Sequence, residues 1–166
     1  QRLSIGGGLR YREAGSNDWV FIPQPVDAVT DTAGGQKPTT TRVQNITFDI
    51  TVRGSDEVWI TSFGGGVRRS LDRGQSWEVI TTDGKPFRAL DELNHRGFSA
   101  TIDTSGNVWI GTVDGISKTA DGGVTWERYR HDNQSQPISA DWAIGLWHNP
   151  WDNSIWSTKI SSVDST

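Results

Sequence analysis

Short apolar runs separated by turn-forming residues recur along the whole chain. The clearest group consists of 98–103 (FSATID), 107–112 (NVWIGT), 116–119 (ISKT) and 125–129 (TWERY), with Gly, Asp, Asn and Ser between the runs. β-branched and aromatic runs of this length, bounded by turn residues, predict short strands joined by tight turns. No segment has an apolar period of 3.6 residues, so we expect an all-β chain with at most one helical turn, at 90–95.

The pattern also repeats at intervals of about 50 residues. Residues 58–80 and 108–130 align along their whole length with a single one-residue adjustment. Residues 4–12 repeat 62–70 at an offset of 58, and 154–160 (SIWSTKI) repeats the strand that begins VWI. A repeat of this length that contains four short antiparallel strands is typical of one blade of a β-propeller.

We therefore predict an all-β propeller of four-stranded antiparallel blades. Dividing 166 residues by the 50-residue repeat gives about 3.3 blades, fewer than the four to eight of a closed propeller. Since the chain also contains no Met, we expect a partial propeller that is an internal stretch of a longer protein or that assembles with further copies. The predicted organisation is the end of one blade at 1–22, blades at 44–80 and 98–130, the start of another at 142–166, and links between blades at 23–43, 81–97 and 131–141.

Two octapeptides share the pattern S/T-x-D-x-G-x-S/T-W, at 70–77 and at 119–126. In such a segment the Asp carboxylate can accept hydrogen bonds from backbone N–H groups, and Gly supplies left-handed backbone. The Trp ring can anchor the turn to the blade. We expect a structural role for Ser70, Asp72, Gly74, Ser76, Trp77, Thr119, Asp121, Gly123, Thr125 and Trp126.

These two octapeptides resemble the Asp-box (BNR) repeats of a β-propeller family. That family includes sialidases, xyloglucan-active glycoside hydrolases, sortilin-type receptors and secreted bacterial proteins, so the resemblance implies a fold and no single activity. In the family the box is a structural turn far from any active site. The sequences of 62–77 and 108–126 most resemble those of secreted bacterial propellers that carry sorting domains. This resemblance implies an extracellular or cell-surface location.

The composition excludes several kinds of functional site. Without Cys the chain can form no disulfide framework, thiolate zinc site or Cys nucleophile, and a net charge of −4 disfavours nucleic-acid binding. No stretch approaches the roughly 18 apolar residues of a membrane span. His95, His131 and His148 are scattered and are expected in loops, so we predict no metal and no cofactor.

The catalytic candidates are few. A glycosidase needs two carboxylates that face one cleft, and Asp49 and Asp103 are best placed because each is expected near the end of an inner strand. Turn capping is the commoner task for such residues. A sialidase would need an FRIP-like motif and a Tyr–Glu pair, whereas 21–23 reads FIP and Tyr is scarce.

Binding is favoured over catalysis. In the predicted topology the links between blades share one face of the disc with the turns between second and third strands, and long loops on a rigid scaffold commonly bind ligands. The aromatic segment with Trp142, Trp147, His148 and Trp151 could stack on sugar or peptide there, or pack in a blade core. We predict a non-catalytic binding or scaffold module for glycan or protein. The alternatives are part of a carbohydrate-active glycoside hydrolase and a structural subunit of an extracellular assembly.

Overall fold

The computed structural model shows a chain built almost wholly of antiparallel strands, and the predicted all-β class is confirmed. It describes residues 9–22, 28–30, 36–38, 47–88, 91–132, 135 and 137–160. Within them the only helical segment is a 3-10 turn, η1 (Leu93–His95), inside the region where one helical turn was expected. No helix in this part of the chain is long and apolar enough to cross a membrane.

Two complete four-stranded sheets form the middle of the molecule. The first consists of β5 (Thr47–Arg53), β6 (Glu57–Ser62), β7 (Gly66–Ser70) and β8 (Glu78–Ile80). The second consists of β9 (Gly97–Ile102), β10 (Val108–Thr112), β11 (Gly115–Thr119) and β12 (Glu127–Tyr129). In both sheets each strand pairs with its neighbour in sequence, which is the arrangement of a propeller blade.

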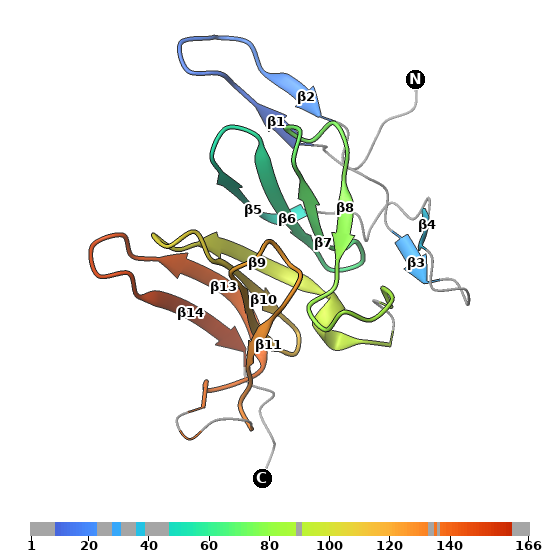
Figure 1. Cartoon of the computed structure of the whole chain (residues 1–166), viewed down its shortest axis with the longest axis vertical. Coiled ribbons are helices and arrows are strands. Elements are labelled where there is room, and N and C mark those ends of the chain that lie inside the picture. Colours follow the sequence, from blue (N-terminus) through green and yellow to red (C-terminus); the bar gives the residue numbers. More distant parts are fainter. Residues whose placement is uncertain are drawn as a thin grey trace.

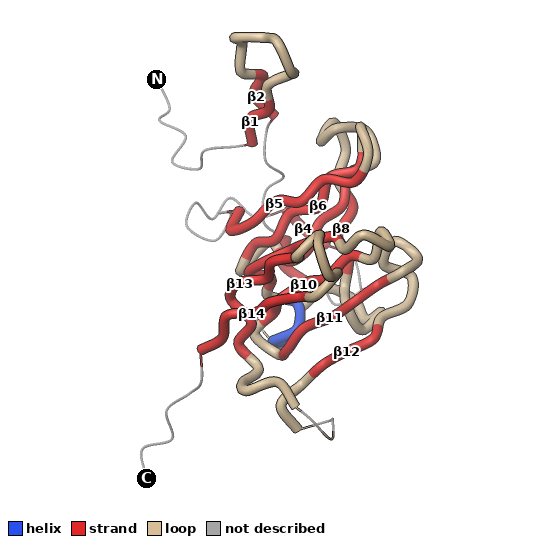
Figure 2. The backbone as a smooth tube through the Cα atoms, turned by 90° about the vertical axis from the view of Figure 1, so that its left-hand side faces the viewer, coloured by secondary structure: helices blue, strands red, loops and turns tan. Residues whose placement is uncertain are grey.

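A strand pair lies at each end of this row of sheets. The pair β1 (Leu9–Tyr11) and β2 (Val20–Ile22) lies at one end, and β13 (Trp142–His148) and β14 (Ile155–Ile160) lie at the other (Figure 1). A further hairpin, β3 (Ala28–Thr30) with β4 (Gln36–Pro38), occupies part of the segment for which only a link was expected. Figure 2 shows the same row of strands from the side.

The core lies between successive sheets rather than inside any one of them. Trp59 and Val67 of the first sheet pack against Ala100, Val108 and Ile110 of the second. A second cluster joins the second sheet to the last strand pair, through Ile116, Ala143 and Leu146. Each sheet is therefore stabilised mainly by apolar area that it buries against the next one.

The first strands of successive sheets are also joined by polar contacts. A carboxylate oxygen of Asp49 on β5 accepts the backbone N–H of Ala100 on β9 at 3.0 Å. At the other end of β5, Arg53 donates to the carbonyl oxygen of Gly106 at 2.9 Å. These contacts fix the inner strands side by side, in the order β5, β9 and β13.

The same contacts recur in each repeat. A cation lies over the β6 and β10 tryptophans, with Arg69 at 5.5 Å from the Trp59 ring and Lys118 at 5.2 Å from the Trp109 ring. Each of these two cations in turn pairs with a Glu on the fourth strand of its own sheet. The 50-residue repeat of the sequence is thus a repeat of three-dimensional contacts.

Candidate functional site

The two octapeptide turns, 70–77 and 119–126, are closed by their own side chains. In the second, the Asp121 carboxylate accepts hydrogen bonds from the Thr125 backbone N–H and hydroxyl group, at 2.9 and 2.6 Å. The Thr119 hydroxyl group donates to Asp121 at 2.8 Å and accepts the Gly123 N–H. The first turn repeats these bonds with Ser70, Asp72, Gly74 and Ser76.

These bonds stabilise the ionised carboxylates. Hydrogen bonds from Ser76 and Ser70 lower the pKa of Asp72 to about 2, and those from Thr125 and Thr119 hold the pKa of Asp121 far below its usual range. Gly74 and Gly123 touch the preceding sheet, because a Cβ atom there would lie 2.9 Å from Ile22 and 3.0 Å from Ile80 respectively. The turns therefore link one sheet to another, and their carboxylates are engaged in the hydrogen bonds that close each turn.

The two catalytic candidates, Asp49 and Asp103, are also engaged in hydrogen bonds within the fold. Asp49 accepts the N–H groups of Ile50 and Ala100. Asp103 is buried and accepts hydrogen bonds from the Asn107 backbone and amide and from the Trp109 indole at 2.9 Å. Burial raises the pKa of Asp103, but these bonds outweigh burial and lower it. The observed geometry is that of a capped turn between β9 and β10.

The predicted aromatic segment is divided between two ends of the last strand pair. Trp142 begins β13, whereas His148 ends it and Trp151 lies in the following turn, 89% exposed. Trp147 is paired across the sheet with Trp156 and is 57% exposed. The four residues therefore do not form one cluster.

Instead, Trp142 joins three phenylalanines from the two preceding sheets. The Phe98 ring centroid lies 5.6 Å from that of Phe48, 5.8 Å from that of Phe63 and 6.2 Å from that of Trp142. The guanidinium group of Arg96 lies 5.1 Å from the Phe63 ring centroid. We call Phe48, Phe63, Phe98 and Trp142 the aromatic cluster.

A repeated backbone irregularity places the cluster. The pairing of β5 with β6 skips Phe48, and the pairing of β9 with β10 skips Phe98, so both residues lie in β-bulges at the start of an inner strand. A bulge re-aims its side chain out of the regular alternation of the sheet. Phe48 and Phe98 lie 50 residues apart, so the sequence repeat itself contains a signal for them.

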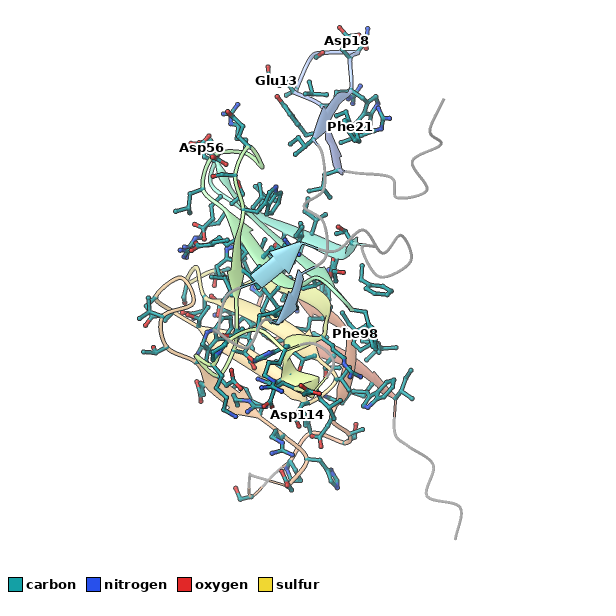
Figure 3. All side chains as sticks on the ribbon, turned by 90° about the vertical axis from the view of Figure 1, so that its right-hand side faces the viewer. Glu13, Asp18, Phe21, Asp56, Phe98 and Asp114 are labelled. Atoms are coloured by element: carbon teal, nitrogen blue, oxygen red, sulfur yellow. The ribbon has the colours of Figure 1, made fainter. Side chains whose placement is uncertain are left out.

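A polar pocket of about 390 Å³ shares Trp142 with the cluster. Its lining includes the side chains of Asp114, Arg130, His131 and Asp141, and Trp142 forms one wall. Asp114 lies 3.1 Å from the Arg130 guanidinium group, and Asp141 accepts the His131 backbone N–H at 2.7 Å. Figure 3 labels Phe98 of the aromatic cluster and Asp114 of the pocket.

His95 lies in the link between the two complete sheets, as expected for a loop histidine, but its side chain is fully buried. The Arg88 backbone N–H donates to Nδ1 at 2.8 Å, which leaves Nε2 to donate to Asp83 at 2.9 Å. Burial raises the pKa of Asp83, but the hydrogen bonds from His95 and neighbouring groups outweigh burial and lower it to about 2. The ring also stacks on Phe87, which packs against the β6–β7 turn at Gly66. The pair thereby holds this link on the sheet.

A stacking surface beside a polar pocket suits a ligand with both a flat apolar face and hydroxyl or amide groups. Among the described residues, no group of three or more His, Asp or Glu side chains could hold a metal ion. The groups that this region offers are aromatic rings, carboxylates and a guanidinium group.

The two successive four-stranded sheets, packed face to face with their first strands on the inside, define a β-propeller fold. No protein-family model matches the sequence, and no curated protein matches it. Similarity is found among solved structures.

Two of these are structures of the extracellular domain of BT4673 from B. thetaiotaomicron, described in one case as a hybrid two component system and in the other as a one component system. Their TM-scores are 0.63 and 0.59, each at 15% sequence identity. Both matches cover 92% of this chain and 18% of the BT4673 chain, so this chain spans less than a fifth of that length. An ancestral GH74 enzyme matches with a TM-score of 0.46 and 15% identity over 84% of this chain and 28% of its own.

Proposed function

We propose that this chain is part of an extracellular or cell-surface propeller that binds a glycan without converting it. The observation that carries the proposal is the aromatic cluster beside the polar pocket, joined by Trp142. Sugar rings present apolar C–H faces that stack on aromatic side chains, and their hydroxyl groups suit carboxylate and guanidinium partners. The cluster draws on the first strands of three successive sheets, so a rigid scaffold holds it.

The location is supported by the fold neighbours. The BT4673 structures are of an extracellular domain, described as part of a one or two component system. We extend this location to the present chain because the folds agree over 92% of its length.

The absence of turnover is supported by the carboxylates. Asp49 joins two sheets and Asp103 caps a turn, so neither is left to act as a general acid or nucleophile. Asp114 in the pocket is paired with two arginines, Arg128 and Arg130.

The test is a glycan array followed by titration calorimetry with the best binder. We expect Trp142→Ala to weaken binding by roughly tenfold or more, because a buried aromatic anchor is commonly worth over 1.4 kcal/mol at an interface. Trp151→Ala is the matched control, since Trp151 is 89% exposed and outside the cluster. Equal affinities of the two variants would contradict the proposed site.

The same experiment distinguishes the hydrolase alternative. Glycans incubated with the chain would be analysed by mass spectrometry for shortened products. Products that wild type forms and that Asp49→Ala or Asp103→Ala does not form would show that the chain belongs to a carbohydrate-active enzyme rather than to a binding module. Binding of peptides rather than glycans on a parallel array would move the proposal to a protein ligand.

A further inference from the structure

The link at 81–97 and the link at 131–141 place one residue each at an equivalent point of the repeat. In the first link, the His95 carbonyl oxygen lies 3.1 Å from the position that a Cβ atom on Gly66 would take. In the second link, the Asp141 carbonyl oxygen accepts the Gly115 N–H at 2.6 Å. Gly66 begins β7 and Gly115 begins β11, so Asp141 stands in the second link where His95 stands in the first.

The two links cover this point differently. In the first link Phe87 is 2% exposed and stacks on the His95 ring, with 5.8 Å between the ring centroids. The second link contains no Phe, Tyr or Trp, and its Asp141 side chain lines the polar pocket of about 390 Å³. The second link therefore leaves room for a flat group that a ligand brings.

Asp141 is the hydrogen-bond acceptor that this pocket offers to a ligand. Its Oδ1 accepts the His131 backbone N–H at 2.7 Å, and no donor among the described residues reaches its Oδ2. A carboxylate has about four acceptor sites, so several remain for a ligand. Asp114, the other carboxylate of the lining, is already paired with Arg128 at 2.6 Å and Arg130 at 3.1 Å. The pocket therefore favours a ligand with an N–H or O–H donor.

Much of the remaining lining is apolar. Its apolar side chains are Leu93, Val113, Ala140, Trp142 and Ile160. A ligand that carried only hydroxyl groups would leave this surface in contact with water, whereas a methyl group close to the donor would cover part of it. Ser139 adds a hydroxyl group to the lining, which can donate to a carbonyl oxygen.

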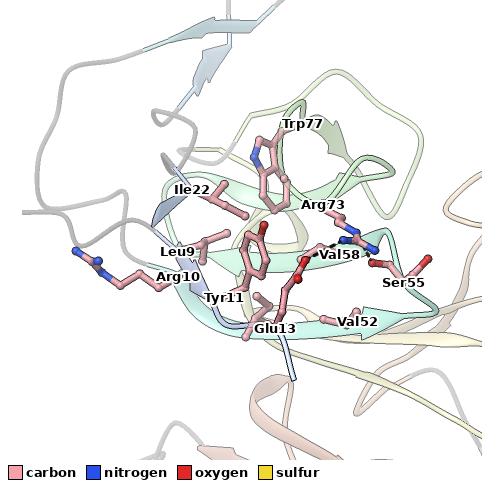
Figure 4. A pocket seen from close by; sticks show the side chains of 12 residues that line it. Leu9, Arg10, Tyr11, Glu13, Ile22, Val52, Ser55, Val58, Arg73 and Trp77 are labelled. Carbon is pink, nitrogen blue, oxygen red and sulfur yellow. Dashed lines mark hydrogen bonds and ion pairs between the residues drawn. The ribbon is translucent and has the colours of Figure 1, made fainter. Parts of the chain in front are cut away.

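The pocket of about 270 Å³ between β1–β2 and the first complete sheet does not combine these features (Figure 4). Its apolar lining consists of Leu9, Ile22, Ile50, Val52, Val58 and Trp77. Its carboxylate belongs to Glu13, which faces the guanidinium group of Arg73 at 3.6 Å. That acceptor is thus already paired with a cation, unlike Oδ2 of Asp141.

We propose that the glycan contains an N-acetylated amino sugar and that the polar pocket binds its acetamido group, an inference that rests on the proposed function. The amide N–H donates to Oδ2 of Asp141, and the amide oxygen accepts the Ser139 hydroxyl group. The methyl group contacts Leu93 and Val113. The sugar ring stacks on Trp142, which belongs to both the pocket and the aromatic cluster. An acetamido group is flat and carries a donor, an acceptor and a methyl group, so it matches every part of this lining.

A glycan array tests the class of ligand. The array carries oligosaccharides of N-acetylglucosamine and N-acetylgalactosamine beside identically linked oligosaccharides of glucose, galactose and the free amino sugars. We expect the N-acetylated oligosaccharides to bind roughly tenfold or more tightly than their counterparts, because the counterparts lack the amide and the methyl group. Equal binding of a counterpart would overturn the proposal. An array on which no glycan binds would instead refute the proposed function, so the two failures are distinguishable.

Asp141→Asn tests the residue that receives the amide N–H. The Asn oxygen still accepts the His131 N–H, whereas the NH₂ group that replaces Oδ2 presents donors to the ligand. In titration calorimetry the affinity for the N-acetylated trisaccharide that binds best should fall roughly tenfold, and the affinity for its unsubstituted counterpart should not change. Asp132→Asn is the control, since it removes the same charge from an exposed residue outside the lining. An unchanged preference in Asp141→Asn, with a wild-type circular dichroism spectrum, would overturn the proposal.

Saturation-transfer NMR on the same N-acetylated trisaccharide tests where its methyl group lies. The acetyl methyl protons should receive the strongest saturation, because the pocket encloses them. Leu93→Ser should weaken that signal relative to the ring protons, and it is a change at a side chain that is 44% exposed and outside the core clusters. Strong signals from the ring protons alone would contradict the placement of the acetamido group in the pocket.

Discussion

Trp59 and Trp156 occupy the same position of the repeat and differ widely in burial. Trp59 is 0% exposed, and Trp156 is 64% exposed. Trp109, the third member of the set, is half-buried, with its ring stacked 5.6 Å from Tyr129. The number of strands beyond each residue follows the same order, since a complete sheet follows Trp59, a strand pair follows Trp109, and no described strand follows Trp156.

This comparison shows that the next sheet completes the burial of the tryptophan of a blade. The ring of Trp59 is covered by Ala100 and Val108 of the next sheet and by the octapeptide turn at Gly123. Local sequence sets the strand and the direction of the side chain, and the next sheet supplies the cover. The stability of each repeat therefore depends on its neighbour, as in other repeat proteins.

The largest expected effect separates the two tryptophans directly. Trp59→Ala should lower the free energy of unfolding by about 3–5 kcal/mol, because it leaves a cavity in the core between the sheets. Trp156→Ala should change it by only about 0.5 kcal/mol, since that ring is mostly in water. Urea unfolding followed by circular dichroism measures both, and similar losses would refute the comparison.

An intermediate effect is expected at two glycines. A Cβ atom on Gly111 of β10 would collide with the Ala143 carbonyl oxygen of β13 and with Ser99, so Gly111→Ala should cost about 1–3 kcal/mol by pushing the strand pair away. On Gly145 of β13 it would meet only the Thr158 hydroxyl group, a side-chain atom that can rotate away. Gly145→Ala is thus the control, and chemical denaturation should rank it clearly below Gly111→Ala.

The smallest effect concerns the turns and depends on pH. The pKa of Asp72 is lowered to about 2 and that of Asp121 is lowered further, whereas an unfolded Asp titrates near pH 4. Lowered pKa values stabilise the fold above pH 4, and this contribution is lost as the pH falls from about 4 toward 2. The combined Asp72→Asn and Asp121→Asn variant should show a flatter decline of thermal stability over this range than wild type. Asp18→Asn, in the β1–β2 loop, should decline as wild type does.

Much of the fold could be read from the sequence because a repeat multiplies weak signals. One short run such as 107–112 predicts a strand only loosely, but its recurrence at 58 and 155 with turns at matching distances predicts the whole blade. The octapeptide turns were equally predictable from the sequence, since every hydrogen bond that closes them joins residues at most four positions apart. The β3–β4 hairpin was missed because nothing repeats it.

The candidate site was predicted only in part. The sequence indicates Trp142 by its place among other aromatic residues. Its partners are Phe98 and, through it, Phe48 and Phe63, which come from sheets far away in sequence. Bulges at the start of two inner strands aim those rings, and a bulge is visible only once the pairing of strands is known. Burial of His95 likewise depends on how its link folds over the sheet.

The sequence by itself determined the strands, the turns, their order and the repeat, because these follow from side-chain alternation and from contacts within a few residues. It did not determine which copies of a repeated residue are buried. Trp59 and Trp156 occupy equivalent positions of similar strands, but a complete sheet follows Trp59 and no described strand follows Trp156, so one is a core residue and the other is exposed. The tertiary structure decided this because apolar burial, unlike a hydrogen-bonded turn, depends on what lies across the interface.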